Sequence, residues 1–140
     1  MTTYASRVRR PPAAVIAFVA WTVIVWATRV RNVTTTAGWT AGDLILPVLF
    51  VVLGLGVAAL FLAPTPPALR VAGMRGAAAL TTVIWVVRVA FIAVHDHPAA
   101  FIAVHVALAV VSVGLAAWAA RAVAPVSPRV GDGLGDTATI

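Results

Sequence analysis

Four stretches of this chain are apolar over about the length that a helix needs to cross a lipid bilayer. They cover residues 12–28, 44–63, 76–94 and 99–120, and strong charges within them are absent or isolated. A bilayer core about 30 Å thick requires roughly 20 mostly apolar residues per helix. Of the 140 residues, 62% are hydrophobic and only 10% are charged, which excludes an ordinary soluble domain. The sequence therefore predicts a membrane protein with four spanning helices.

The segments between the apolar stretches are too short for a soluble domain. The connection 31–42 is polar and contains two glycines, 64–67 is Pro-Thr-Pro-Pro, and 96–98 makes a very tight turn. Short connections favour antiparallel neighbours. We therefore predict an all-α fold over residues 12–123, an antiparallel bundle of four transmembrane helices.

The arginine distribution predicts the orientation of this bundle. One side carries seven arginines: Arg7, Arg9, Arg10, Arg70, Arg75, Arg121 and Arg129. The other side has only Arg29 and Arg31 at the span ends. The excess of positive charge marks the cytoplasmic side, so both termini are expected to be cytoplasmic in a bacterial plasma membrane.

The two ends of the chain are predicted to be tails outside the bundle. Residues 1–11 form a basic tail, and residues 124–140 contain too little apolar surface to order themselves. The basic start also resembles a secretory signal. The apolar run that follows is longer than a usual signal core and lacks a convincing small-x-small cleavage site, so a retained first helix is expected.

A trio of residues occurs twice at an offset of 59 positions. The two trios are Thr22, Trp26 and Arg29, and Thr81, Trp85 and Arg88. Spacings of four and three residues place each trio on one helix face. Residues 56–60 also resemble residues 114–118. The pattern indicates a duplicated helical hairpin with a pseudo-two-fold axis along the membrane normal, and the alternative is coincidence in an apolar sequence of low complexity.

Arg88 is the polar residue that constrains function most, because a charge inside a spanning helix costs about 2.5–3.5 kcal/mol. It should face the bundle interior. Measured from the turn at 96–97, Arg88 and His105 lie at similar depth in consecutive helices, which makes them expected neighbours. The same arithmetic brings Arg29 level with Asp43, where a hydrogen-bonded pair would lower the cost of both charges.

Arg29, Asp43, Arg88 and His105 are therefore the candidate polar pocket. In the functional interpretation, the pocket faces outward, Arg88 receives an anionic or polar group, and His105 titrates near neutral pH. In the structural interpretation, Arg88 only hydrogen-bonds backbone carbonyls and threonine hydroxyls, and His105 is a satisfied histidine of the bundle.

Metal and cofactor sites are not predicted. His95, Asp96 and His97 supply two imidazoles and a carboxylate, but a metal site needs three or four convergent ligands and few others lie on that side. We interpret the triplet as a solvated turn in which His97 or Asp96 caps the next helix and Pro98 lies in its first turn. Only His105 lies well inside the bundle, which disfavours haem bound by two histidines.

Several function classes are disfavoured by the residues present. The chain has no cysteine, no Gly-rich phosphate loop, no HExxH motif, no nucleophile elbow and no carboxylate pair at matched depth. No catalytic residues are therefore assigned, and the protein is not expected to be an enzyme. The arginines are spread over both sides of a membrane, so nucleic acid is not an expected partner.

Two patterns carry a resemblance to a family. They are WT-x2-VW-x2-R-x-RN at 21–32 and DH-x3-F-x2-VH-x2-LA-x2-S at 96–112. These segments resemble small four-span integral membrane proteins of high-GC actinobacteria that lack an assigned function. The resemblance implies four helices and a plasma-membrane location without implying an activity.

We expect a non-enzymatic accessory or scaffold subunit, whose partners are the lipid bilayer and other membrane proteins or a second copy. The alternative is a small transporter or channel with an outward-facing polar pocket around Arg88 and His105. The two hypotheses differ in whether these side chains line an open cavity or are sealed by tryptophan and alanine.

Overall fold

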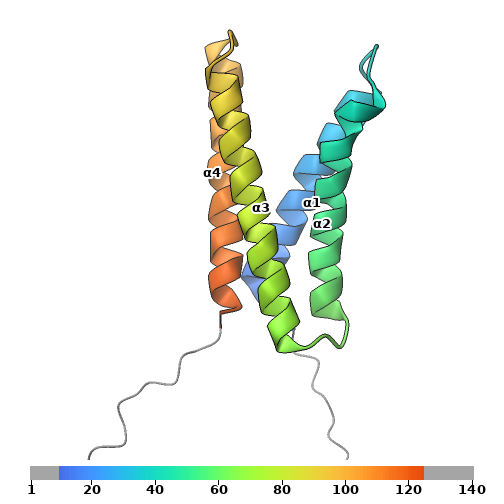
Figure 1. Ribbon diagram of the computed structural model, residues 1–140, viewed down its shortest axis with the longest axis vertical. Helices are drawn as coiled ribbons and strands as arrows, with labels where there is room; N and C mark the ends of the chain where they lie inside the picture. Colours follow the sequence, from blue (N-terminus) through green and yellow to red (C-terminus); the bar gives the residue numbers. More distant parts are fainter. Residues whose placement is uncertain (1–9, 125–140) are drawn as a thin grey trace, which may run out of the picture.

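The computed structural model describes residues 10–124, which form four α-helices joined by short connections (Figure 1). The helices are α1 (Ala13–Thr34), α2 (Ala41–Leu62), α3 (Pro67–Ala93) and α4 (Ala99–Ala122). Each is long and apolar enough to cross a membrane, and the described part of the chain has no β-strand. The predicted all-α bundle of four transmembrane helices is confirmed. Apart from positions 10, 11 and 124, the predicted tails lie outside the described residues.

Two of the helices extend well beyond the apolar stretches that predict them. α1 continues six residues past position 28, through Arg29 and Arg31, and α3 begins at Pro67 instead of position 76. Arginine is a good helix former, so a charged residue does not end a helix as it ends an apolar window. Pro67 starts α3 because proline is favoured at the first helical position, where no N–H partner is needed.

The ends of the helices at the two hairpin loops are closed by local hydrogen bonds. The Thr34 and Thr35 hydroxyls both donate to the Arg31 carbonyl at 3.0 Å, which satisfies an oxygen left free at the end of α1. At the start of α4, Pro98 occupies the cap position and its carbonyl accepts the N–H groups of Phe101 and Ile102. The expected side-chain cap from His97 or Asp96 is therefore wrong, because Pro98 directly precedes the helix and no side-chain cap bond forms.

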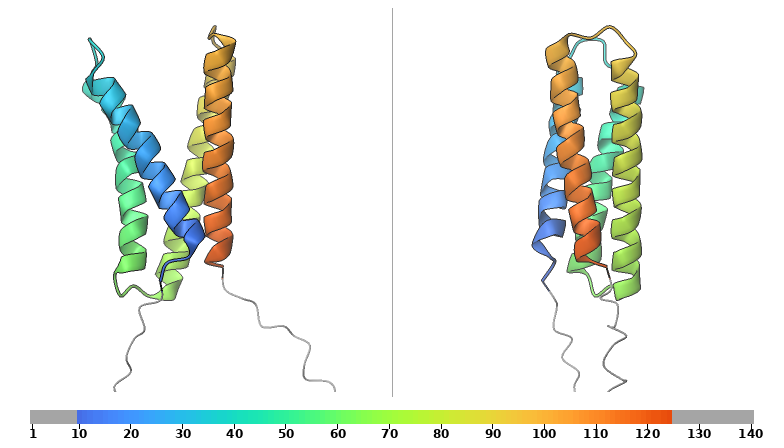
Figure 2. Two further views of the ribbon diagram at one scale, coloured as in Figure 1. Left: turned by 180° about the vertical axis from the view of Figure 1, so that it is seen from behind. Right: turned by 90° about the vertical axis from the view of Figure 1, so that its left-hand side faces the viewer.

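The bundle is two hairpins that meet at one end and diverge toward the other (Figures 1 and 2). We call α1 with α2 the N-terminal hairpin and α3 with α4 the C-terminal hairpin. The end that carries both chain termini and the connection 63–66 is the termini end, and the end that carries connections 35–40 and 94–98 is the loop end. α1 packs against α2 and also against α4, whereas α2 packs against α3 (Figure 2).

The core that joins the hairpins lies in the half of the bundle near the termini end. Phe18, Met74, Ala116 and Ala119 are fully buried there, and they come from α1, α3 and α4. Near mid-height, the Trp21 indole N–H of α1 donates to the Ser112 hydroxyl of α4 at 2.9 Å. The small side chains of α4 allow α1 to approach closely, as small residues do at helix contacts in membranes.

Arg70, a residue of α3, caps the C-terminal end of α2. Its guanidinium donates to the Leu60 carbonyl at 3.1 Å and to the Ala63 carbonyl at 2.9 Å. It also lies 5.8 Å from the centre of the Phe61 ring. A positive group at a helix C-terminus satisfies free carbonyls and complements the helix dipole, so Arg70 holds the turn between the two hairpins.

Candidate functional site

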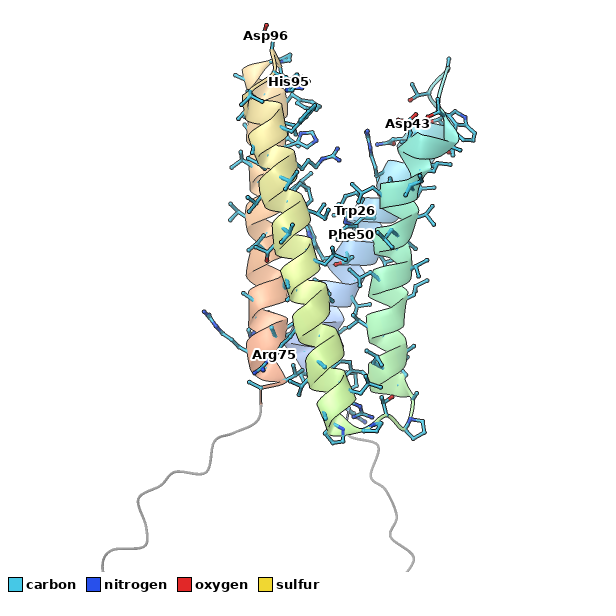
Figure 3. All side chains as sticks on the ribbon, viewed as in Figure 1. Trp26, Asp43, Phe50, Arg75, His95 and Asp96 are labelled. Carbon is cyan, nitrogen blue, oxygen red and sulfur yellow. The ribbon has the colours of Figure 1, made fainter. Side chains whose placement is uncertain are left out.

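A cleft of about 340 Å³ lies between the hairpins in the half of the bundle near the loop end. Its lining comes from α1, α3 and α4: Ile24, Val25, Trp26, Thr28, Arg29, Asn32, Trp85, Arg88, His105 and Leu108. Trp26 and Phe50 lie at the height where the hairpins separate (Figure 3). Apolar rings therefore form the base of the cleft, and polar groups lie nearer its mouth.

The base of the cleft is an aromatic cluster that contacts both hairpins. Trp26 stacks on Phe50 with ring centres 4.5 Å apart and an interplanar angle of 20°. Its ring centre is 6.1 Å from that of Trp85 in the opposite hairpin. All three side chains are buried, with exposed fractions of 4% or less. This cluster closes the cleft toward the termini end.

Helical spacing brings the two arginines above this cluster. Arg29 follows Trp26 by three residues in α1, and Arg88 follows Trp85 by three residues in α3, so each guanidinium lies one turn nearer the loop end than its tryptophan. Arg88 is half-buried, whereas Arg29 is exposed. Both guanidinium groups are positively charged and line the cleft, and no acidic residue among those that the structure describes lines it.

The prediction that Arg88 faces the interior at the level of His105 agrees with this geometry. Both side chains line the cleft, and so does Arg29. The expected polar partner of Arg88 is not found: within residues 10–124, neither Arg88 nor Arg29 donates a hydrogen bond, whereas Arg70 does. The hairpins diverge at this level, so the guanidinium groups face open space and not a neighbouring helix.

His105 lines the cleft with its tautomer defined by a local hydrogen bond. Its Nδ1 lies 2.9 Å from the Phe101 carbonyl, and since a carbonyl only accepts, Nδ1 must carry the proton. Nε2 is then the nitrogen left for a ligand, as an acceptor in the neutral ring and as a donor in the charged ring. The His105 ring also packs on Phe101, with centres 4.1 Å apart. These local contacts fix the orientation of the imidazole.

Asp43 does not line the cleft, and the expected hydrogen bond between Arg29 and Asp43 is not found within residues 10–124, although both residues border one hollow. The Asp43 carboxylate accepts the backbone N–H and the hydroxyl of Thr40, both at 2.9 Å, at the start of α2. A carboxylate at a helix N-terminus is stabilised by the free N–H groups and the helix dipole. Arg29 and Asp43 only border a separate hollow of about 290 Å³ beside the connection 35–40.

The His95-Asp96-His97 turn lies at the far loop end of the C-terminal hairpin (Figure 3). His95 Nδ1 donates to the Phe91 carbonyl at 2.7 Å, and His97 packs on Phe101 with ring centres 4.7 Å apart. Among the described residues, no three histidine, aspartate or glutamate side chains gather as a metal site requires.

Two features of the site were missed from the sequence. Asn32 and Thr28 also line the cleft. Asn32 lies one turn after Arg29 and so shares its helix face, but this could be inferred only by extending α1 past position 28. In addition, the Trp85 indole N–H and the Thr81 hydroxyl are buried without a hydrogen-bond partner. Buried polar groups are rarely left unpaired, so these two unpaired groups point to a functional site. The sequence pattern does not reveal them.

Comparison with known proteins gives no match: no family model, no curated protein and no solved structure matches the chain. The resemblance to small four-span actinobacterial membrane proteins stays a prediction.

Proposed function

We propose that this chain is a non-enzymatic membrane protein that binds an anionic group in the cleft between its two hairpins. The observation that carries the proposal is the convergence of Arg29, Arg88 and His105 from three helices on one hollow, in whose lining residues 10–124 place no acidic side chain. An anion bound beside both guanidinium groups compensates their positive charges and accepts their hydrogen bonds. Arginine suits this role because its planar fork donates two parallel hydrogen bonds to a carboxylate or phosphate.

Ligand binding is favoured over the purely structural role expected from the sequence. Arg88 and His105 line an open cleft and are not sealed by tryptophan and alanine. A pore is disfavoured in this conformation, because the core around Phe18 and Met74 closes the termini end. His105 is the only histidine in the lining and no carboxylate accompanies it, so binding is proposed in place of catalysis. The bilayer is the expected environment, and no nucleic-acid partner is proposed.

We place the loop end outside the cytoplasm of a bacterial plasma membrane, because the arginine excess lies at the termini end. The chain has no cysteine, so single cysteines report sidedness without interference. In intact cells, a membrane-impermeant maleimide is expected to label Thr36→Cys and Asp96→Cys. It should label Ala68→Cys, at the termini end, only after the membrane is disrupted. The reverse pattern would mean that the cleft opens to the cytoplasm.

The two hairpins are also proposed to be copies of one ancestral unit. The buried positions of α3 are Met74, Ala77, Thr81, Trp85 and Ile92. Each lies 59 residues after a buried position of α1: Val15, Phe18, Thr22, Trp26 and Val33. The connection 94–98 is one residue shorter than 35–40, and buried Ser112 and Ala119 accordingly lie 58 residues after buried Gly54 and Phe61. An experimental structure whose hairpins do not superpose at this correspondence would contradict the duplication.

Arg88 variants test the anion site directly. In a zwitterionic bilayer disc, inorganic phosphate, a soluble carboxylate and an anionic detergent are each titrated while the fluorescence of the tryptophans is followed. We expect Arg88→Leu to stay folded, with unchanged or higher thermal stability, because an unpaired charge is removed from the membrane. Its anion affinity should fall on the order of tenfold or more, the effect of losing a hydrogen bond to a charged group.

The controls separate recognition from net charge. Arg88→Lys should restore only part of the affinity, because the ammonium keeps the charge but lacks the planar fork. Arg75→Gln removes an exposed charge at the termini end and should bind anions as the wild type does. Equal anion affinity in Arg88→Leu and the wild type would overturn the proposal, as would a wild-type protein that responds to none of the three anions.

A further inference from the structure

A second hollow adjoins the cleft at the ring of Trp85. It is a groove of about 670 Å³ along α3 and α4, and Trp85 lines both spaces. Its other lining residues are all apolar: Val86, Val89, Ala90, Val106, Ala109, Val110, Val113 and Gly114. A positively charged hollow and a larger uncharged hollow thus share the buried side chain of Trp85 as a common wall.

This arrangement matches the two chemical halves of a lipid. Resting on the anion-binding function proposed above, we propose that the bound anion is the phosphate head group of an anionic phospholipid. The phosphate lies between Arg29 and Arg88, and one acyl chain lies in the groove between α3 and α4. The charge of the head group is complementary to the lining, which contains two arginines and no acid.

The depth of the arginines favours a lipid over a soluble anion. Arg29 and Arg88 each lie five residues from the loop end of their helix, or about 8 Å at 1.5 Å per residue. The cleft also has an exposed apolar edge, because its lining residue Ile24 is 63% exposed. A ligand can therefore enter sideways from the bilayer, with its head group just below the membrane surface.

The unpaired indole N–H of Trp85 is an independent observation that points to the same ligand. The Trp85 side chain is only 3% exposed, lines the junction between the two hollows, and has no acceptor for its N–H. A buried donor without a partner is destabilising in a folded protein. A phospholipid supplies an acceptor at this place, because its ester carbonyls lie between the phosphate and the acyl chains.

Two glycines give a matched pair of variants for the groove. A Cβ added at Gly114, which lines the groove, meets no atom within 4 Å, so a side chain at this position starts in open space in the groove. A Cβ at Gly56, in α2, also meets nothing within 4 Å, and Gly56 lies outside both hollows. Gly114→Leu therefore blocks the acyl chain, and Gly56→Leu is the control of equal size.

The test uses quenching of tryptophan by lipids that carry bromine in one acyl chain. In a background with Trp21, Trp39 and Trp118 replaced by phenylalanine, Trp26 and Trp85 remain as reporters. We expect brominated phosphatidylglycerol to quench them several-fold more than the same fraction of brominated phosphatidylcholine. Arg88→Gln and Gly114→Leu should each remove this excess, whereas Arg75→Gln and Gly56→Leu should retain it. Native mass spectrometry of the same variants, made in the chain with all its tryptophans, should show less retained phosphatidylglycerol for Arg88→Gln and Gly114→Leu than for Arg75→Gln and Gly56→Leu.

The outcomes distinguish the lipid from the anion site. If inorganic phosphate binds in an Arg88-dependent way but phosphatidylglycerol shows no excess quenching, the anion site stands and the lipid proposal is overturned. Excess quenching that persists in Gly114→Leu overturns the acyl groove. Excess quenching that persists in Arg88→Gln reflects general surface attraction and overturns the head-group site. A protein that binds neither phosphate nor phosphatidylglycerol overturns both proposals.

Discussion

Replacement of Trp26 with alanine is expected to lower the free energy of unfolding by about 3–5 kcal/mol, the range for large aromatic side chains removed from a packed core. Trp26 is 4% exposed, stacks on Phe50 within its own hairpin and contacts Trp85 of the other. In a membrane, helices associate through close packing more than through the hydrophobic effect, so the cost comes from lost contacts and from the cavity. Reversible unfolding in mixed micelles measures it.

Two tryptophans serve as controls for this effect. Trp118 is 52% exposed, and Trp118→Ala should change stability by less than about 1 kcal/mol, as surface substitutions usually do. Trp85→Ala should cost less than Trp26→Ala, because the residue that corresponds to Phe50, 58 positions later in α4, is Leu108, so Trp85 lacks a comparable stacking partner. If Trp26→Ala were no more harmful than Trp118→Ala, the aromatic cluster would not be what joins the hairpins at the base of the cleft.

The number and type of the helices were predictable because the bilayer imposes a compositional requirement that four segments meet. The bounds of the helices were less predictable. An apolar stretch ends at the first charged residue, whereas a helix can continue through it. α1 continues through Arg29 and Arg31 because a long basic side chain can extend toward water from a helix in the membrane. The prediction therefore assigned to a loop the turn of helix that carries Asn32, a residue of the cleft lining.

The part of the site that depends only on depth along the helices was predictable. Counting residues from a turn placed Arg88 level with His105, and both line the cleft. The same arithmetic placed Arg29 level with Asp43, and both border one hollow, but a hydrogen-bonded pair does not form because the Asp43 carboxylate accepts from Thr40 at the start of its own helix. The divergence of the hairpins depends on how side chains fill the space between four helices. A single sequence does not specify this packing, so it left undecided whether the cleft is open or sealed, and it did not predict the unpaired Trp85 N–H.

Gly54→Leu is expected to have the other large effect, by forcing α1 and α2 apart. A Cβ at Gly54 would lie 2.9 Å from the Cγ2 of Val23 and 3.5 Å from the Cγ2 of Thr22. Valine has one stiff side-chain torsion in a helix, so Val23 cannot turn away without strain. Gly54→Ala should lower the free energy of unfolding by about 1–3 kcal/mol, the usual cost of overpacking, and Gly54→Leu by more.

The matched control is Gly56, two residues along the same helix. A Cβ there meets nothing within 4 Å, so Gly56→Leu should be neutral or stabilising, because leucine has the higher helix propensity. Thr22 and Trp26 lie on one face of α1, so a displacement at Gly54 also moves the base of the cleft. Gly54→Leu should therefore weaken anion binding as well as folding, and Gly56→Leu should preserve both. Equal stability of the two leucine variants would show that close packing at Gly54 does not hold the N-terminal hairpin together.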